Sequence, residues 1–543
     1  MSEPRPILEV KDLGVSRGST IELERLSFRL DGGETLVLLG DENSGKDVLL
    51  RVLGSYLQRG DELSGTIKLG EGPALPAAKR AKIGLRIVYL AAAAEAPLNP
   101  HASVLAQLSR AIARRTGSPR TSAREELRIA LERFPDAPTL AALNQRPGAL
   151  GAKDLSWALL AAAMAQTPDL LIADHAFGDL TPRSIRSIVG ALMAEQKRLG
   201  FALLYAARGL KAAARLDSRV IVLRQGKVIE EGSFTRLASG QSHAYTRTLF
   251  KALPKPLAAP PARNATREPL LQVQGLDLIG AKKNAPRSRD GITFELRRGA
   301  SLALIGEDGS GRRELVRALL GLDRVAGGRV VLDQVDMSIL SAPMTSRMRR
   351  RIAFITGADD ALDPRMTLWD TVDEPLRAHL RLPRDMVAGH RETALKRVGL
   401  ASHDGRRAVA TLSPFDKRRL QVARAIVSAP FLAVIDEPLR GLDAFAQSIL
   451  TELLEDFRRQ EGPAFLVITA DVGVAQVLAE DAMFFKDHKV VERGALRDIL
   501  RNPRDEETRE LIEASAPPVR DRGSVDLPQV STYNVPQRTA VPE

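Results

Sequence analysis

The 543-residue chain contains no cysteine, which excludes disulfide bridges and thiolate metal sites. It also lacks any uncharged apolar run of the roughly 20 residues that a membrane-spanning helix needs. The first residues of the chain have no apolar core of the kind found in signal peptides. We therefore expect the protein to work in the cytosol.

The composition shows little bias apart from a basic excess. Charged residues make up 27% and hydrophobic residues 44% of the chain, as in ordinary globular proteins. The 79 basic and 67 acidic residues give a net charge of +12, which would suit nucleic acid or an anionic membrane surface. Spread over such a length, this excess more often reflects a basic surface without a dedicated partner. The length predicts roughly two to four domains.

An apolar run at residues 432–436 ends in two carboxylates, Asp436 and Glu437. A buried parallel strand reads as a near-continuous apolar run, and residues at its carboxyl end lie where α/β sheets bind ligands. Upstream, residues 301–315 have the order strand, glycine-rich loop and helix that is typical of a P-loop. Together the two stretches predict a nucleoside-triphosphate site.

The same layout occurs near the N-terminus. Residues 34–50 form a second P-loop pattern, and residues 170–174 form a second apolar strand, which ends at Asp174. Each half continues with another apolar strand and a polar hairpin. Two copies at this spacing indicate duplicated domains and not a solenoid.

The repeat and the local composition predict the domain organisation. The predicted parts are a first domain at 1–253, a proline-rich linker at 254–269, a second domain at 270–513 and a disordered tail at 514–543. In the first half, residues 122–125 read as a capping box, and Leu127, Leu131 and Phe134 fall on one helical face. This pattern predicts a helical insert between the P-loop and the strand that ends at Asp174.

Three further segments indicate which kind of P-loop protein this chain resembles. The sequence Tyr245-Thr246-Arg247 follows the first half, residues 507–509 are a weaker copy of it, and residues 363–367 read Asp-Pro-Arg-Met-Thr. With the two P-loops, these segments resemble tandem ATP-binding-cassette proteins of the oligopeptide and dipeptide importer type. The resemblance covers the chain up to about residue 513. It implies two α/β P-loop NTPase domains in tandem, each with an antiparallel β part and a helical insert, packed head to tail.

Both P-loops depart from the family pattern. A P-loop binds nucleotide because backbone N–H groups surround the phosphates, a lysine neutralises their charge and a hydroxyl holds magnesium. The first half keeps Lys46 but has Asp47 at the hydroxyl position, where a carboxylate can hold magnesium yet repels phosphate. The second half has Arg312 and Arg313 at these two positions, and arginine is not an equivalent replacement for lysine. We expect nucleotide chiefly at the Lys46 site; the alternative for both loops is an empty pocket kept for packing.

The resemblance assigns the site residues position by position. The candidate ATP-binding residues are Gly40, Ser44, Gly45, Lys46, Asp47, Asp174, Gly306, Ser310, Gly311, Arg312, Arg313 and Asp436. The candidate Mg²⁺ ligands are Asp47, Asp174 and Asp436. The catalytic carboxylate that polarises the attacking water matches Glu437 in the second half and is replaced by His175 in the first. An ion pair between Glu437 and Arg312 or Arg313 is an equally supported alternative. A metal-ligand role for His175 is disfavoured, because no second ligand lies at suitable spacing.

The signature segments, which approach the γ-phosphate in this family, fall on residues 150–154 and 412–416. In the second of them Pro414 removes an N–H group and Phe415 adds bulk, so we expect this signature to be blocked. The half with the P-loop lysine therefore lacks the catalytic glutamate, and the half with the glutamate lacks the lysine. We expect hydrolysis to be impaired.

By resemblance, the chain is the ATP-binding component of a peptide importer. It would lie in the cytoplasm on the inner face of the cell membrane, bound to permease subunits and acting indirectly with a substrate-binding protein. A non-hydrolysing scaffold or regulatory protein of the same fold is the alternative, and substantial ATP turnover would discriminate against it. Action on ribosomes or nucleic acid is disfavoured, because the linker of about 15 residues is short and not strongly basic.

Overall fold

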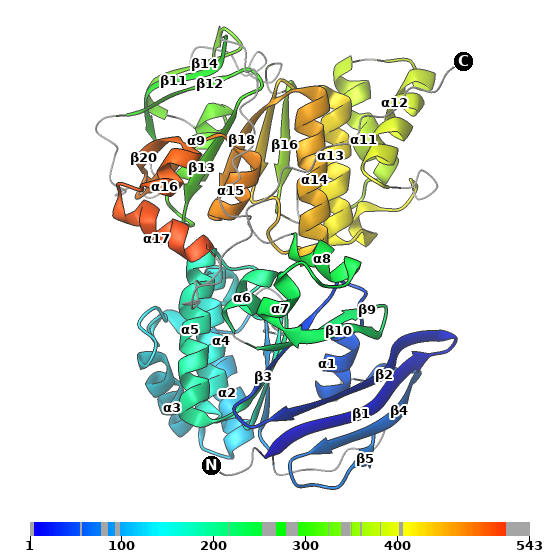
Figure 1. Ribbon diagram of the computed structural model, residues 1–543. Helices are drawn as coiled ribbons and strands as arrows, with labels where there is room; N and C mark the ends of the chain where they lie inside the picture. The colour runs from blue at the N-terminus through cyan, green and yellow to red at the C-terminus, as the bar shows by residue number, and fades with distance from the viewer. Residues whose placement is uncertain are drawn as a thin grey trace.

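The computed structural model consists of two halves of the same architecture, stacked one above the other (Figure 1). It describes residues 5–54, 57–77, 85–92, 98–216, 218–251, 268–278, 291–323, 325–337, 348, 350–358, 361–380, 382–400 and 405–516. We refer to the described residues up to 251 as the first half and to those from 268 as the second half. The predicted linker and tail lie outside the described residues, apart from residues 268–269 and 514–516.

Each half contains one four-stranded and one six-stranded sheet. In the first half the antiparallel sheet has the order β2-β1-β4-β5, and the six-stranded sheet has the order β10-β9-β3-β8-β7-β6, with β10 antiparallel to β9. The strands are β1 (Pro6–Arg17), β2 (Thr20–Asp31), β3 (Thr35–Leu39), β4 (Asp61–Leu69), β5 (Leu75–Pro76), β6 (Ile87–Ala91), β7 (Leu170–Asp174), β8 (Ala202–Ala206), β9 (Arg219–Arg224) and β10 (Lys227–Ser233).

Most helices of the first half cover the face of the six-stranded sheet that points away from the antiparallel sheet. They are α2 (Val104–Thr116), α3 (Arg120–Glu132), α4 (Ala152–Ala165), α5 (Pro182–Leu199), α6 (Leu210–Arg215), α7 (Phe234–Ala238) and α8 (Ala244–Phe250). Helix α1 (Lys46–Gly54) lies on the opposite face, in the core shared with the antiparallel sheet. The predicted helical insert is present as α2 and α3, and Leu127, Leu131 and Phe134 are buried. The predicted capping box is wrong. Helix α3 begins at Arg120, before residue 122, because Pro119 sits at the N-cap with a φ of −57° that suits a helix start.

The second half repeats this order. Its sheets run β12-β11-β14-β15 and β16-β17-β18-β13-β19-β20. The strands are β11 (Pro269–Leu278), β12 (Ile292–Arg297), β13 (Ser301–Gly306), β14 (Val325–Leu332), β15 (Val335–Asp336), β16 (Ile352–Thr356), β17 (Leu432–Asp436), β18 (Ala464–Thr469), β19 (Asp481–Lys486) and β20 (Lys489–Ala495). The helices are α9 (Arg312–Leu319), α11 (Leu368–Pro375), α12 (Arg384–Arg397), α13 (Pro414–Ser428), α14 (Ala444–Glu461), α15 (Val472–Leu478), α16 (Leu496–Arg501) and α17 (Glu506–Ser515).

The apolar central strands explain why the six-stranded sheet is covered on both faces. Along β3, Val37 and Leu39 pack into the core under the helices, whereas Leu36 and Leu38 pack into the core under the antiparallel sheet. Because side chains alternate along a strand, an entirely apolar strand can fill two cores at once. The prediction of two α/β P-loop domains, each with an antiparallel β part, is therefore confirmed.

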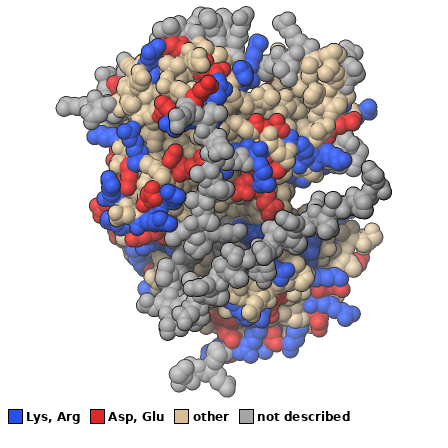
Figure 2. Space-filling model, turned by 45° about the horizontal axis from the view of Figure 1, so that its top comes forward, with Lys and Arg blue, Asp and Glu red and all other residues tan. Residues whose placement is uncertain are grey.

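Charged side chains of both signs share the surface. On the face drawn in Figure 2, Lys and Arg side chains lie interspersed with Asp and Glu side chains. Among the described residues, none of the helices has the length and apolar character needed to cross a membrane.

Candidate functional site

The first P-loop connects β3 to α1 and folds around its own lysine. Lys46 is 3% exposed, and its ammonium donates hydrogen bonds to Gly40 O (2.7 Å), Asp41 O (2.7 Å) and Ser44 Oγ (2.9 Å). Gly40 has a φ of +155°, and a Cβ there would lie 2.3 Å from Leu223 O, so the turn needs a glycine. Burial, the largest influence, lowers the pKa of Lys46. The predicted residues of this loop thus come together as expected.

Two carboxylates and an imidazole meet beside this loop. Nε2 of His175 lies 3.3 Å from Oδ1 of Asp47 and 3.6 Å from Oδ1 of Asp174, and Tyr89 Oη donates a hydrogen bond to Asp174. Burial alone would raise the pKa of Asp47. The hydrogen bond and charge of His175, together with Lys46, hold the pKa of Asp47 below its usual value instead. The Asp47 and His175 replacements therefore interact directly.

This cluster fits a magnesium ion held through oxygen atoms. Ligand atoms of Asp47, Asp174 and His175 all lie within 4.8 Å of one another, and magnesium prefers carboxylate oxygens. Nδ1 of His175 is buried and has no hydrogen-bond partner in the described part of the chain. A metal-bound histidine normally donates its other N–H, so we assign the proton to Nε2, as a donor to Asp47. With this assignment His175 orients Asp47. The expectation that no further ligand lies near His175 is wrong, because folding brings Asp47 and Asp174 beside it.

A cavity of about 920 Å³ opens between this loop and the second half. Its volume is in the range of small-molecule sites. Lys46, Asp47 and His175 line it from the first half, and Pro414, Phe415 and Asp443 line it from the second. Burial raises the pKa of Asp443, although the hydrogen bond from Ala446 N and the charge of Lys46 oppose this shift.

The second P-loop, between β13 and α9, is filled by its own arginines. Arg312 is 3% exposed; its Nε donates to Ser310 Oγ (3.1 Å), and its Nη1 lies 3.7 Å from Oε1 of Glu437. Nε of Arg313 lies 3.3 Å from Oδ2 of Asp436. Burial raises the pKa of Asp436, although Arg313 opposes it. A guanidinium thus covers the carboxylate that was predicted to bind magnesium in this half.

The backbone of this loop still has P-loop geometry. Gly306 ends β13, and Gly311 caps α9 with a φ of +101°. In the first half, Gly45 precedes α1 with a φ of +94°, and Ser44 is buried. Hence the scaffold of the two loops is shared, and the side chains make the difference.

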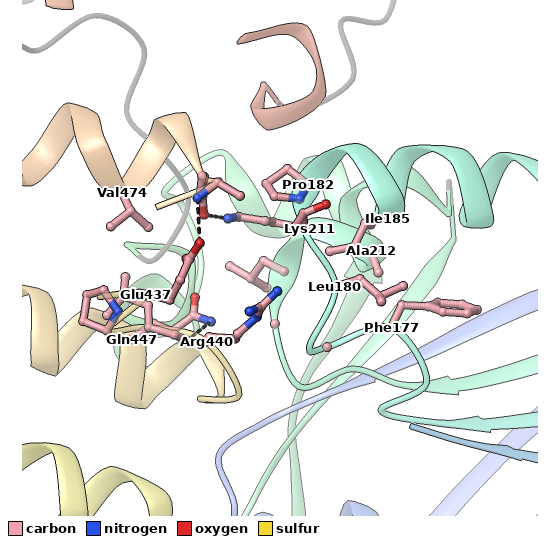
Figure 3. A pocket seen from close by; sticks show the side chains of 18 of the residues that line it. Phe177, Leu180, Pro182, Ile185, Lys211, Ala212, Glu437, Arg440, Gln447 and Val474 are labelled. Carbon is pink, nitrogen blue, oxygen red and sulfur yellow. Dashed lines mark hydrogen bonds and ion pairs between the residues drawn. The ribbon is translucent and has the colours of Figure 1, made fainter. Parts of the chain in front are cut away.

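Glu437 and His175 occupy matching backbone positions. Both are left-handed, with φ of +46° and +48°, and their N–H groups donate to Ile468 O (2.9 Å) and Ala206 O (3.0 Å). The carboxylate of Glu437 accepts hydrogen bonds from Ala470 N (2.7 Å) and Thr469 Oγ1 (3.1 Å). Figure 3 shows Glu437 beside a pocket lined by both halves, whose volume is about 70 Å³. That space is too small for a nucleotide.

The two signature segments begin helices. Helix α4 starts at Ala152, directly after Gly151, and α13 starts at Pro414 with Ser413 Oγ capping Asp416 N at 3.1 Å. The guanidinium of Arg419 lies 4.6 Å from the ring centroid of Phe415. The N-terminus of α13 thus faces the first P-loop with a bulky side chain.

Contacts across the halves were not predicted from the sequence. Thr181 Oγ1 donates to Glu307 Oε2 (2.8 Å), and Arg440 Nε donates to Asp179 O (3.1 Å). The ring of Tyr245 lies against that of Phe445 in the second half, and its hydroxyl accepts a hydrogen bond from Asp41 N (2.8 Å) within the first half. Only Tyr245 had a signal in the sequence, as part of the segment after the first half, and that signal assigned it no place in the site.

The chain is similar to known proteins over most of its length. The family model described as ABC transporter matches residues 23–178 and 289–440. Glutathione import ATP-binding protein GsiA of Escherichia coli (strain K12) is 28% identical over 569 residues, covering 95% of this chain and 91% of the relative. The same protein of Shigella sonnei (strain Ss046) gives the same figures. A solved structure titled cbiO1 from Clostridium perfringens, part of an ABC transporter complex, is 22% identical, covers 44% of this chain and 92% of that chain, and has a TM-score of 0.40. Since the family model spans more than half of the chain, the protein belongs to the ABC transporter family.

Proposed function

We propose that this chain is the ATP-binding component of an importer for peptide-like substrates, and that it binds ATP at the Lys46 site. The observation that carries the proposal is the cavity of about 920 Å³ between the first P-loop and the N-termini of α13 and α14. Its walls come from both halves, which supports a head-to-tail arrangement with one nucleotide between them. The GsiA relatives are named for glutathione import, and we extend import of a peptide-like substrate to this chain as part of the proposal.

Magnesium is expected with ATP in this family, and Asp47 and Asp174 are our candidates to hold it in the first half. When bound, the ion would neutralise phosphate charge. His175 would keep Asp47 oriented through the 3.3 Å contact. Lys46 would exchange its hydrogen bonds to Gly40 O and Asp41 O for the phosphates, which carry full negative charge and are stronger acceptors.

We further propose weak hydrolysis at most. Polarising the attacking water needs a base next to the γ-phosphate. In the first half that position holds His175, whose Nε2 is engaged with Asp47. In the second half Glu437 is engaged by Ala470 N and Thr469 Oγ1, and Arg312 lies close to it.

The proposal also names the binding partners of the chain and its location in the cell. Permease subunits in the membrane would hold the chain on the cytoplasmic face, with a substrate-binding protein acting indirectly. We keep the division into domains at 1–253 and 270–513, joined by the linker 254–269 and followed by the tail 514–543. A non-hydrolysing scaffold is the second candidate, favoured by the arginines that fill the second P-loop.

Titration of labelled ATP with and without magnesium, together with a turnover assay, tests these proposals. We expect one magnesium-dependent binding event per chain and a very low turnover. Absence of ATP binding at millimolar concentration would favour the scaffold, and robust turnover would contradict the weak-hydrolysis proposal.

A further inference from the structure

Tyr245 joins the first P-loop to the opposite half. It lies in the first turn of α8 and is 5% exposed. Its hydroxyl accepts the hydrogen bond from Asp41 N (2.8 Å), and its ring centroid lies 6.1 Å from that of Phe445, in the first turn of α14. Figure 1 shows α8 of the first half against α14 of the second. Ala444 and Phe445 pack with the hydrophobic core of the first half, so this contact is part of a core and not a surface touch.

The equivalent contact at the other edge of the interface, between α17 of the second half and α5 of the first, is an ion pair. Glu507 is the second residue of α17, as Tyr245 is of α8, and Arg183 is the second residue of α5, as Phe445 is of α14. Oε1 of Glu507 lies 2.7 Å from Nη1 of Arg183, and Oε2 lies 2.9 Å from Nζ of Lys486. Both carboxylate oxygens are therefore engaged by cations. Of these two equivalent residues, Tyr245 hydrogen-bonds to the backbone of a P-loop, whereas Glu507 pairs with cations.

We propose that Tyr245 is a positioning residue: it couples the shape of the first phosphate-binding loop to the contact between the two halves. This inference deepens the proposed nucleotide site, and its use in transport rests on that proposal.

The backbone around Asp41 shows how the coupling works. Asp41 O accepts a hydrogen bond from Lys46, whereas Asp41 N donates to Tyr245. If phosphate draws the ammonium of Lys46 away, Asp41 O keeps the hydrogen bond from Ser44 N (3.1 Å) within the loop, and Tyr245 remains the contact that ties Asp41 to α8. Phe445 fixes the Tyr245 ring, because buried aromatic pairs with ring centroids 4.5–7 Å apart attract one another, at about 1 kcal/mol beyond area burial. A shift of α14 therefore moves the hydroxyl that holds the loop.

Hydrogen exchange in the nucleotide-free full chain tests the coupling directly. Tyr245→Phe keeps the ring and removes the hydroxyl, so the amides of residues 40–45 should exchange about fivefold faster, the effect of one neutral hydrogen bond. Phe445→Ala lies in the other half and should speed the same amides. In the double variant these amides should exchange only slightly faster than in the more affected single variant, because both changes break the same link from the loop through Tyr245 to α14.

Arg183→Ala is the matched control, since it removes the side chain at the corresponding position on the other side of the interface. It should leave exchange at residues 40–45 unchanged. Thermal unfolding of each variant checks that the chain is folded. Unchanged exchange in folded Phe445→Ala would overturn the coupling, and so would an equal effect of Arg183→Ala, which would indicate general loosening.

An ATP titration separates this inference from the proposed function. Tyr245→Phe and Phe445→Ala should each raise the Kd for Mg-ATP, by about fivefold for Tyr245→Phe. An unchanged Kd in both variants would overturn the coupling of nucleotide to the interface. If the unaltered protein binds no ATP, the proposed function fails, while the exchange measurements still decide whether Tyr245 couples the loop to α14.

Discussion

Arg312 and Glu437 form a buried ion pair, with Nη1 of the arginine 3.7 Å from Oε1 of the glutamate. The arginine stands at the P-loop lysine position and the glutamate at the position of the catalytic carboxylate. The carboxylate of Glu437 thus stands where Arg312 would otherwise meet a phosphate, and the guanidinium of Arg312 neutralises the buried charge of Glu437. This arrangement matches the ion-pair alternative for Glu437, and whether Glu437 also acts in catalysis stays a prediction.

Nucleotide binding should depend on Lys46 far more than on Arg312. Lys46→Ala removes the ammonium beside the large cavity and should weaken ATP binding by about tenfold or more, because hydrogen bonds to charged groups contribute about 1.5–3 kcal/mol. Arg312→Ala should change the Kd less than about twofold, a change worth under half a kcal/mol. Calorimetric titration with Mg-ATP measures both. Equal effects would contradict the assignment.

ATP turnover should be far below that of an intact cassette and insensitive to Glu437→Gln. Hydrolysis needs phosphate, magnesium and an activated water in line at one site, and a misplaced part costs orders of magnitude. A coupled phosphate-release assay on the purified chain measures the rate. A robust magnesium-dependent rate that Glu437→Gln abolishes would show that the second site works.

The Arg312–Glu437 pair should be coupled in stability. Arg312→Met leaves Glu437 buried without a cation, and Glu437→Gln leaves Arg312 only the half-exposed carboxylate of Asp308, at 3.9 Å; we expect each to cost about 3 kcal/mol. The double variant should cost clearly less than both single changes added together. Urea unfolding gives the three values. Arg365→Met, in an exposed pair with Asp363, serves as a control and should leave the transition unchanged. Additive costs in the cycle would show that the pair is not coupled.

Asp47 should stabilise the fold except in acid. Its folded pKa lies below the usual value of 3.8, so its contribution is fully present above pH 3.8 and is lost as the pH falls through the folded pKa. The stability difference between the unaltered protein and Asp47→Asn should stay constant from about pH 7 to pH 5 and shrink below about pH 4. Urea unfolding over this pH range measures it. A difference that widens in acid would reverse the sign and contradict the interpretation.

Membrane attachment should require permease subunits. None of the described helices is suited to cross a membrane, and a basic surface alone gives a weak, salt-sensitive attachment. Co-sedimentation with protein-free anionic liposomes should therefore be lost at about 0.5 M salt. Salt-resistant binding to such liposomes would count against the importer proposal.

The sequence predicted the scaffold better than the side-chain contacts. Apolar strands that end in Asp174 and Asp436, together with two glycine-rich loops, carry local patterns, so the tandem α/β fold followed from them. The start of α3 was misplaced because Pro119 outweighed the capping pattern at residues 122–125. The contact of Tyr245 with Phe445 could not be predicted, since no local pattern records which surfaces of the two halves meet.

The unlike chemistry at the two edges of the interface makes the chain sensitive to its solvent. Salt shortens the range of charge attraction to about 3 Å at 1 M, which weakens the partly exposed Arg183–Glu507 edge. The ring contact of Tyr245 with Phe445 keeps its strength in salt, although the exposed Lys251–Glu452 pair at the same edge weakens. Rising ionic strength should therefore loosen the interface more at Glu507 than at Tyr245.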